Sequence, residues 1–250
     1  MKPTRLLSCA LAATLALGAS AVATGAVGPA ENSFGAASAA QAATAPASFT
    51  RTATYPVFQN VPAGVDPAAP TVAEISAVSG DGKTLIYTDA LGKRIGFLDI
   101  SDPAAPAGLG TVSLDQLGHA DDQPTSVAVY GEYVLVVIDE TGSDFTAPKG
   151  RLDVLRLSDR SRVASIDLAG QPDSIAISKD GAFAAIAIEN QRDEEFKPAG
   201  GKKGDLPQLP AGFVQIIELD STPTDWAATP IPFVNPDGSA CTWPRLRPLA

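Results

Sequence analysis

Short apolar runs, separated by polar turns, fill the central part of the chain. Three stretches, 71–102, 122–159 and 170–220, follow the same order of strand, turn, strand, loop, strand and acidic turn. The closest match pairs Ala-Val-Ser-Gly-Asp-Gly at 77–82 with Ala-Ile-Ser-Lys-Asp-Gly at 176–181. Asp-Gly favours hairpin turns because glycine adopts a positive φ at little cost. The pattern therefore predicts three repeats of antiparallel strands.

The spacing of the repeats indicates their architecture. Val78, Val129 and Ile177 occupy corresponding positions, 51 and then 48 residues apart. A repeat of about 40 to 50 residues made of short strands is typical of a β-propeller blade. We predict an all-β fold, a partial β-propeller whose three blades cover 71–121, 122–169 and 170–235. The predicted strands are 73–79, 84–88, 94–100 and 108–114, then 125–129, 133–138, 151–157 and 162–168, then 174–178, 183–188, 212–219 and 228–233.

The segment before the repeats, 43–70, is predicted to hold one strand and a linker. Residues 49–59 alternate weakly, and a strand there could close a propeller ring by pairing with the last blade. The following run, 62–70, contains three prolines and one glycine, which favour a rigid turn region.

The amino end has the pattern of an export signal. Lys2 and Arg5 precede an apolar run, Leu6 to Leu17, that is too short to span a bilayer. Ala-x-Ala sites follow at 21–23 and 40–42, and we favour the later one because low-complexity sequence continues to it. Residues 1–42 are therefore predicted to be a signal peptide and leader of a secreted protein with no later membrane span.

Charge and cysteine content narrow the range of functions that the chain could have. The chain has 250 residues, 45% of them apolar, and a net charge of −10. Without residues 1–42, 16 basic and 27 acidic residues remain, a net charge of −11. A nucleic-acid partner is excluded because it requires a basic face on the protein. The negative electrostatic field of this chain instead favours cations such as calcium. Loss of Cys9 with the signal leaves Cys241 alone, so no intrachain disulfide can form.

Acidic residues at strand ends suggest a metal site. In a propeller, the connection into each innermost strand and the loop between the second and third strands open on one face. Glu74, Asp139, Glu189 and Asn190 lie at such positions and are the candidate ligands, with calcium as the possible cofactor. The alternative is that these residues only end hairpins, since no Asp-x-Asp-x-Asp-Gly loop is present.

Catalytic motifs are missing. His119 is the single histidine, and Asp121 and Asp122 lie close to it in sequence, but no Gly-x-Ser-x-Gly elbow supplies a nucleophile. Lys202-Lys203-Gly204 lacks the frame of a phosphate-binding loop. No catalytic residue is therefore assigned.

Several segments resemble known families. Residues 172–181 look like the inner-strand signature of YVTN and LVIVD propellers. Residues 72–77, 96–100, 124–129 and 172–190 together resemble the amino-terminal part of secreted bacterial proteins named for an esterase-like activity of phytase. They also resemble propeller modules of surface-anchored proteins related to alkaline phosphatase. The resemblance implies a phytase-like or esterase-like hydrolase.

Two departures from these families shape the functional expectation. A propeller closes with four to eight blades, and about three fit here. The stretch 236–250 has no strand pattern and looks like a non-family tail, so we expect a truncated or frame-shifted product. The leading hypothesis is a scaffold or ligand-binding platform that acts with a downstream hydrolase domain or a surface ligand. The alternatives are a metal-assisted phosphoester or ester hydrolase and a non-enzymatic propeller for protein interaction.

Overall fold

The computed structural model describes residues 49–205, 208–220, 222–233 and 239. The chain divides into two units, 1–48 and 49–250, and only the second contains described residues. The predicted signal peptide and leader lie outside the described residues, as does all of the predicted tail except Ser239.

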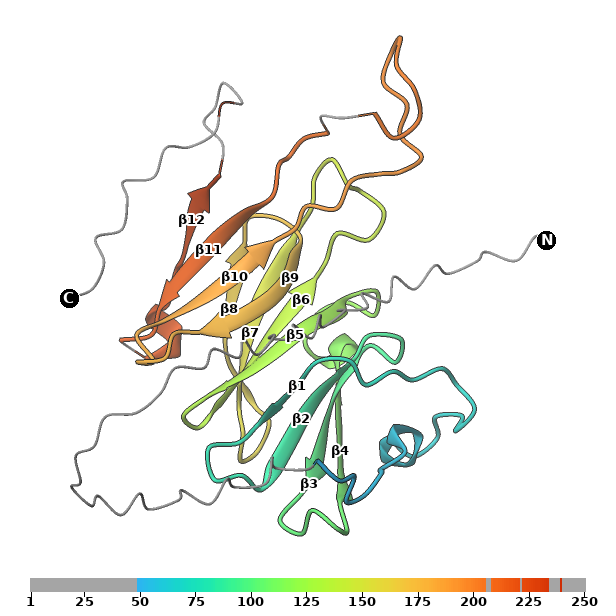
Figure 1. The fold of residues 1–250 in the computed structure, drawn as a ribbon, viewed down its shortest axis with the longest axis vertical. Helices are drawn as coiled ribbons and strands as arrows, with labels where there is room; N and C mark the ends of the chain where they lie inside the picture. Colours follow the sequence, from blue (N-terminus) through green and yellow to red (C-terminus); the bar gives the residue numbers. More distant parts are fainter. Residues whose placement is uncertain (1–48, 206–207, 221, 234–238, 240–250) are drawn as a thin grey trace, which may run out of the picture. The chain divides into compact units, whose positions relative to one another are not determined.

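The fold is all-β, as predicted. It contains three four-stranded antiparallel sheets, and in each sheet every strand pairs with its neighbour in sequence (Figure 1). A four-stranded antiparallel sheet of this order is the form of a propeller blade, so the three predicted blades are confirmed. Blade 1 contains β1 (Ser76–Val78), β2 (Thr84–Asp89), β3 (Arg94–Asp99) and β4 (Ala107–Ser113); blade 2 contains β5 (Gln123–Tyr130), β6 (Tyr133–Asp139), β7 (Gly150–Arg156) and β8 (Arg162–Leu168); blade 3 contains β9 (Pro172–Ile177), β10 (Phe183–Ile188), β11 (Phe213–Glu218) and β12 (Ala228–Pro232).

Strand β1 is shorter than its prediction of 73–79. Glu74 and Ile75 still contact β2, but irregularly, because the Ile75 amide donates to the Thr88 hydroxyl instead of a ladder carbonyl. The Glu74 amide reaches the Thr88 carbonyl at 3.3 Å. The sequence therefore located the strand correctly but not its first residues.

Blade 2 is apolar on both faces, and alternate residues of β6 point to opposite neighbours. Val134, Val136 and Ile138 join the cluster that packs blade 2 against Ile86 and Phe97 of blade 1. All five are buried to within 1% of full burial. This explains why β6 reads as an unbroken β-branched run rather than an alternating one.

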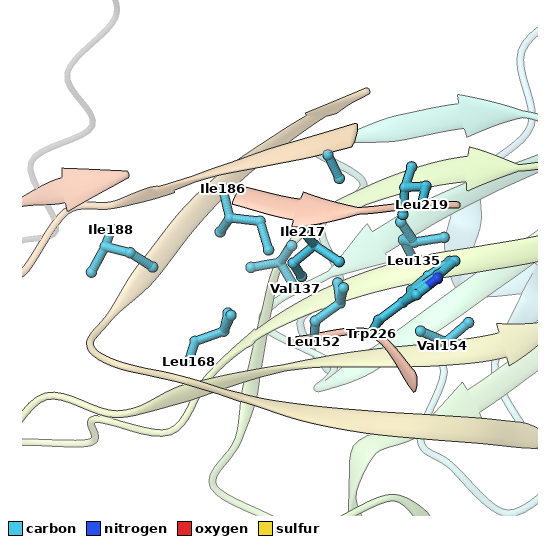
Figure 2. Close-up of a cluster of buried hydrophobic side chains, with 11 residues drawn as sticks. Leu135, Val137, Leu152, Val154, Leu168, Ile186, Ile188, Ile217, Leu219 and Trp226 are labelled. Atoms are coloured by element: carbon cyan, nitrogen blue, oxygen red, sulfur yellow. The ribbon is translucent and has the colours of Figure 1, made fainter. Parts of the chain in front are cut away.

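The other face of blade 2 packs against blade 3. Leu135 and Val137 of β6 meet Ile186 and Ile217 of blade 3 in a second buried cluster (Figure 2). Trp226, to which the sequence pattern assigned no role, closes one end of this cluster. Its ring lies edge-on to Tyr130, with centroids 5.9 Å apart.

Hydrogen bonds also connect blades 2 and 3. The Tyr130 hydroxyl donates to the Leu219 carbonyl at 2.9 Å. The amide of Ala169 donates to the side chain of Gln215 at 2.8 Å, and Gln215 is 2% exposed. Each bond satisfies a polar group at the interface, so the two blades are joined by both apolar packing and polar contacts.

The repeated Asp-Gly hairpins have the same geometry in blades 1 and 3. In blade 1, the Ser79 hydroxyl donates to Asp81 at 2.6 Å and accepts the Thr84 amide at 2.9 Å. Blade 3 repeats both contacts from Ser178, and the glycines of the two turns have φ values of 74° and 71°. The sequence match at these turns therefore reports a shared local structure.

The strand predicted within 49–59 is wrong. No strand forms in this segment, which ends in a 3-10 helix, η1 (Val57–Asn60). Asn60 is buried and fixes the helix to blade 1 by accepting the Gly110 amide at 2.7 Å and donating to the Tyr87 hydroxyl and the Phe97 carbonyl. Side-chain bonds to a sheet face, rather than strand pairing, therefore hold this segment.

One face of blade 1 and one face of blade 3 point away from blade 2. Strand register places Leu85, Tyr87 and Leu98 on the outer face of blade 1, where residues of the 49–60 segment lie against them around a cavity of about 320 Å³. On blade 3 the outer face includes Phe183 and Ile216, and Phe183 is 40% exposed. In the described ranges, helices occur as three short 3-10 turns, and none could cross a membrane.

Candidate functional site

The loops between the second and third strands of the three blades lie at one end of their sheets, as the topology requires. Because neighbouring strands are antiparallel, the segment leading into the first strand and the loop between the second and third strands share an end. We call this end the loop face. Its loops between second and third strands are 90–93 in blade 1, 140–149 in blade 2 and 189–212 in blade 3.

A buried cluster of charges lies at the loop face of blade 2, around Arg151 at the start of β7. Its Nη1 atom donates to Asp122 at 2.6 Å and to Glu140 at 2.5 Å, and its Nε atom donates to Asp153 at 3.0 Å. Arg162 also contacts Asp153 at 3.4 Å. Three carboxylates thus surround a guanidinium that is 5% exposed.

The electrostatics of this cluster favour charged Arg151. Burial alone would lower its pKa, but the hydrogen bond to Asp122, the charge of Asp153 and the hydrogen bonds to Asp153 and Glu140 outweigh burial and raise the pKa. Its Nη2 atom is buried and donates no hydrogen bond to the described residues. A Cβ on Gly118 would lie 2.8 Å from this atom, so only glycine lets the loop pass so close.

Blade 1 holds a simpler version of the same arrangement. Asp89 at the end of β2 accepts from Arg94 at 2.9 Å, and both side chains are buried. The other carboxylate oxygen of Asp89 accepts the amides of Val72 and Gly92, each at 2.8 Å. These acids therefore fix loops onto the sheet, a structural role that leaves Asp89 few free lone pairs.

Three of the four predicted metal ligands lie together at the loop face of blades 2 and 3. Asp139 accepts from the side chain of Gln171 at 3.0 Å, and the Gln171 amide donates to Asn190 at 2.9 Å. Asn190 also donates to the Ala211 carbonyl at 2.9 Å. Gln171 therefore bridges Asp139 and Asn190, whose side chains are engaged in holding the loops.

Of these three, Glu189 lacks such an engagement: its side chain makes no hydrogen bond or ion pair with the described residues. Burial raises its pKa, and the nearby charges of Asp173 and Asp139 raise it further. Glu74 lies apart from this group, on the cavity at the outer face of blade 1. Among the described residues, no three His, Cys, Asp or Glu side chains form a group that could hold a metal ion. The calcium site stays a prediction.

His119 lies in the connection between blades 1 and 2 and is exposed. Its backbone amide donates to Asp122, but Asp122 is paired with Arg151. Asp121 pairs instead with Lys93 at 3.1 Å. No hydrogen bond joins the imidazole to a described carboxylate, so the two nearby acids do not orient it as a base.

An apolar hollow of the loop face lies between loops 140–149 and 189–212, which come from neighbouring blades. It has a volume of about 310 Å³. Its lining comprises Ser143, Asp144, Phe145, Thr146, Asp193, Phe196, Gln208 and Leu209. We call this hollow the interblade pocket. A polar hollow of about 440 Å³ adjoins it and shares Gln208.

Sequence reasoning identified both loops and the acids at 193–195, but not the pocket. Its apolar residues, Phe145, Phe196 and Leu209, are separated by polar stretches, so no periodic pattern connects them. The available signal was the presence of large apolar residues in otherwise polar loops, which is unusual unless they are covered or functional. Phe196 and Leu209 are 42% and 75% exposed.

Three four-stranded sheets of blade form, two of them with long loops on the loop face, define the class of the protein as a domain of propeller type. The chain belongs to the choice-of-anchor I domain family, whose model matches residues 74–242. No curated protein sequence matches it.

Solved structures with distant similarity include several enzymes. Hydrazine synthase of Kuenenia stuttgartiensis is 17% identical, with 67% of this chain and 56% of that chain covered and a TM-score of 0.39. A 6-phosphogluconolactonase, described as putative, from Bacteroides uniformis is 17% identical, with 68% and 46% covered and a TM-score of 0.43. A corresponding Bacteroides fragilis protein is 14% identical, with 67% and 39% covered and a TM-score of 0.43. The chain spans about two fifths to just over half of their lengths.

Proposed function

We propose that this chain is the ligand-binding platform of an exported propeller protein, and that its binding surface is the interblade pocket. One observation carries the proposal. The two longest connections between consecutive described strands, 140–149 and 189–212, come from neighbouring blades and together enclose the pocket. A cavity of about 310 Å³ falls within the size range of small-molecule sites.

The strands beneath the pocket support this role because they form a fixed base. Blades 2 and 3 share a buried cluster, and the Ile175 amide donates to the Ser126 hydroxyl across their innermost strands at 3.3 Å. Loops on a rigid scaffold are where binding residues gather. The two loops that form the pocket walls are thus held by strands at both of their ends, while the sequence within each loop can vary.

Binding is favoured over hydrolysis because the polar side chains that could act in catalysis are engaged in structural contacts or lack a partner that would activate them. Asp89, Asp122 and Asp153 are paired with arginines, and the His119 ring lacks a carboxylate partner among the described residues. A metal-assisted hydrolase needs free ligands and an activated water. Any esterase-like or phosphatase-like activity would then belong to a hydrolase domain that acts beside this platform.

Nile red, a neutral apolar dye, tests the platform function on the purified chain. We expect saturable fluorescence enhancement by the wild type and its loss in the double variant Phe196→Ser, Leu209→Ser. Leu91→Ser is the matched control, because Leu91 is a 58% exposed leucine in the corresponding loop of blade 1. Equal dye binding by all three proteins, each with an unchanged melting curve, would refute the proposed site.

Chromogenic phosphate and acetate esters test the hydrolase alternative. We expect no turnover of p-nitrophenyl phosphate or p-nitrophenyl acetate above a buffer blank, with or without added calcium. Calcium-dependent turnover that disappears in Glu189→Ala would replace the platform by a metal-assisted hydrolase.

A further inference from the structure

The interblade pocket combines an apolar lining with acidic residues. Phe145, Phe196 and Leu209 supply two aromatic rings and a branched aliphatic group, so the pocket suits one aromatic ring or a short aliphatic chain. The charged residues in its lining are Asp144 and Asp193, both acidic, and no basic side chain of the described residues lines it.

Asp144 is held in its ionised form by its own turn. Its Oδ1 atom accepts the Thr146 hydroxyl at 2.7 Å and the amides of Thr146 and Ala147, each at 3.2 Å. The Thr146 hydroxyl, followed by its amide, lowers the pKa of Asp144. The second oxygen, Oδ2, accepts no hydrogen bond from the described residues and remains able to accept one from a ligand.

Asp193 is positioned in a similar way on the opposite loop. Its Oδ1 atom accepts the Glu195 amide at 2.8 Å. Gln208 brackets its backbone, accepting the Asp193 amide at 2.9 Å and donating to the Asp193 carbonyl at 3.1 Å. These bonds fix the acidic residue relative to the pocket before a ligand arrives, which reduces the entropic cost of binding.

We propose that the interblade pocket binds a small organic cation with an aromatic or aliphatic body, such as an arylalkylammonium group. This inference rests on the proposed function and names its ligand class. The apolar body fills the space between Phe145 and Phe196, and the ammonium group meets the carboxylates of Asp144 and Asp193. Aromatic faces attract cations as well, and the net charge of −10 favours their approach.

Three probes that share a phenylethyl group separate the effect of charge from that of the apolar body. Phenethylammonium, 2-phenylethanol and 3-phenylpropionate share a phenyl ring and differ in the charge of the head group. We expect calorimetric titration to show phenethylammonium binding about tenfold more tightly than 2-phenylethanol, the effect of one partly exposed ion pair with an aromatic contact. Binding of 3-phenylpropionate should be weakest, and added salt should reduce the preference for the cation.

The variants Asp144→Asn and Asp193→Asn test the assignment of the charge. Asparagine can form the same turn as aspartate, so the loops should keep their structure. We expect each change to weaken the binding of phenethylammonium and to leave the affinity for 2-phenylethanol unchanged. Asp159→Asn is the matched control, because Asp159 forms an equivalent turn with Ser161 in blade 2 outside the pocket.

The outcomes distinguish this inference from the platform function. If the three probes bind equally, or if the anion binds best, while Nile red still binds, the cation assignment is wrong and the platform stands. If neither Nile red nor any probe binds to the wild type, both proposals fail.

Discussion

The Oδ2 atom of Asp122 lies 2.6 Å from the Nη1 atom of Arg151, and both side chains are almost completely buried. Asp122 also accepts the His119 amide at 3.0 Å. The pair therefore fixes the connection between blades 1 and 2 to β7, the third strand of blade 2. Removing Asp122 takes one charge-assisted hydrogen bond from a buried guanidinium and the acceptor from the His119 amide.

Replacement of Asp122 should destabilise the fold. Arg151 keeps Asp153 and Glu140 as partners, so we expect Asp122→Ala to reduce the free energy of unfolding by about 1.5–3 kcal/mol, measured by urea denaturation. Its neighbour provides the control, since Asp121 pairs with Lys93 on the surface and its side chain is 99% exposed. Asp121→Ala should leave the unfolding curve unchanged, and equal effects of the two changes would contradict a structural role for the buried cluster.

Loss of the Asn60 side chain should release the segment before blade 1. Asn60→Ala removes the contacts with Tyr87, Phe97 and Gly110 and leaves buried groups of β3 and β4 unsatisfied. We expect a loss of about 1–3 kcal/mol in unfolding free energy, together with faster proteolysis within 49–60. Gln59→Ala changes an exposed neighbour and should alter neither quantity. Unchanged proteolysis of Asn60→Ala would show that other contacts hold the segment.

Trp226 should contribute more to the joining of blades 2 and 3 than the hydroxyl of Tyr130 does. Trp226→Ala leaves a cavity beside Tyr130 and Tyr133 and should cost about 3–5 kcal/mol of unfolding free energy. Tyr130→Phe removes only the hydrogen bond to Leu219 and should cost about 1 kcal/mol. Thermal denaturation followed by near-ultraviolet circular dichroism measures both. A larger loss of stability in Tyr130→Phe than in Trp226→Ala would show that the hydrogen bond contributes more to the interface than the packing of Trp226 does.

Glu189 should make stability depend on pH. Its pKa is raised in the folded protein by burial, by Asp173 and by Asp139, so the folded state binds a proton more readily than the unfolded chain. The ordinary pKa of a glutamate side chain is 4.5. The wild type should therefore lose stability relative to Glu189→Gln as the pH rises from this value through the raised pKa of the folded protein. Urea unfolding at pH 4 and pH 7 compares the two proteins.

At pH 4 the two curves should coincide, and at pH 7 the variant should be the more stable. Asp102→Asn changes an exposed acid in the turn between β3 and β4 and provides the control. A wild type that is more stable than Glu189→Gln at pH 7 only when calcium is added would instead support the predicted metal site.

The outer face of blade 3 should cause the purified chain to self-associate. Phe183 is 40% exposed there, and Ile216 lies beside it on the same face. In the described residues no further sheet covers them. Sedimentation velocity should show oligomers whose population rises with concentration and falls in the variant Phe183→Ser. A monomer at every concentration would contradict this prediction.

Much of the fold could be predicted because its signals are local. The Asp-Gly turns at 81–82 and 180–181 and the apolar run 134–138 each fix their structure within a few residues. Residues 49–59 misled the prediction because weak alternation resembles a strand, whereas Asn60 fixes the segment through partners up to 50 residues away.

The candidate site was harder to predict because its contacts are distant in sequence. Arg151 meets Asp122 across 29 residues, and no spacing rule connects the two. Asp139 and Asn190 were correctly expected on one face, yet Gln171, which joins them, carries no motif. Phe145 and Leu209 line the same pocket only because two loops of unequal length fold toward each other.

The hairpin turns formed by Ser79 and Ser178 satisfy their own donors within a few residues. They need nothing from the opposite end of the blade, so strand register is set independently of loops 140–149 and 189–212. For protein engineering, this separation makes the three blades a scaffold for loop exchange. A library that keeps the loop-anchoring residues Glu140 and Asn190 could vary the other residues of loops 140–149 and 189–212 and select new ligands, while the turns at the other end preserve the fold.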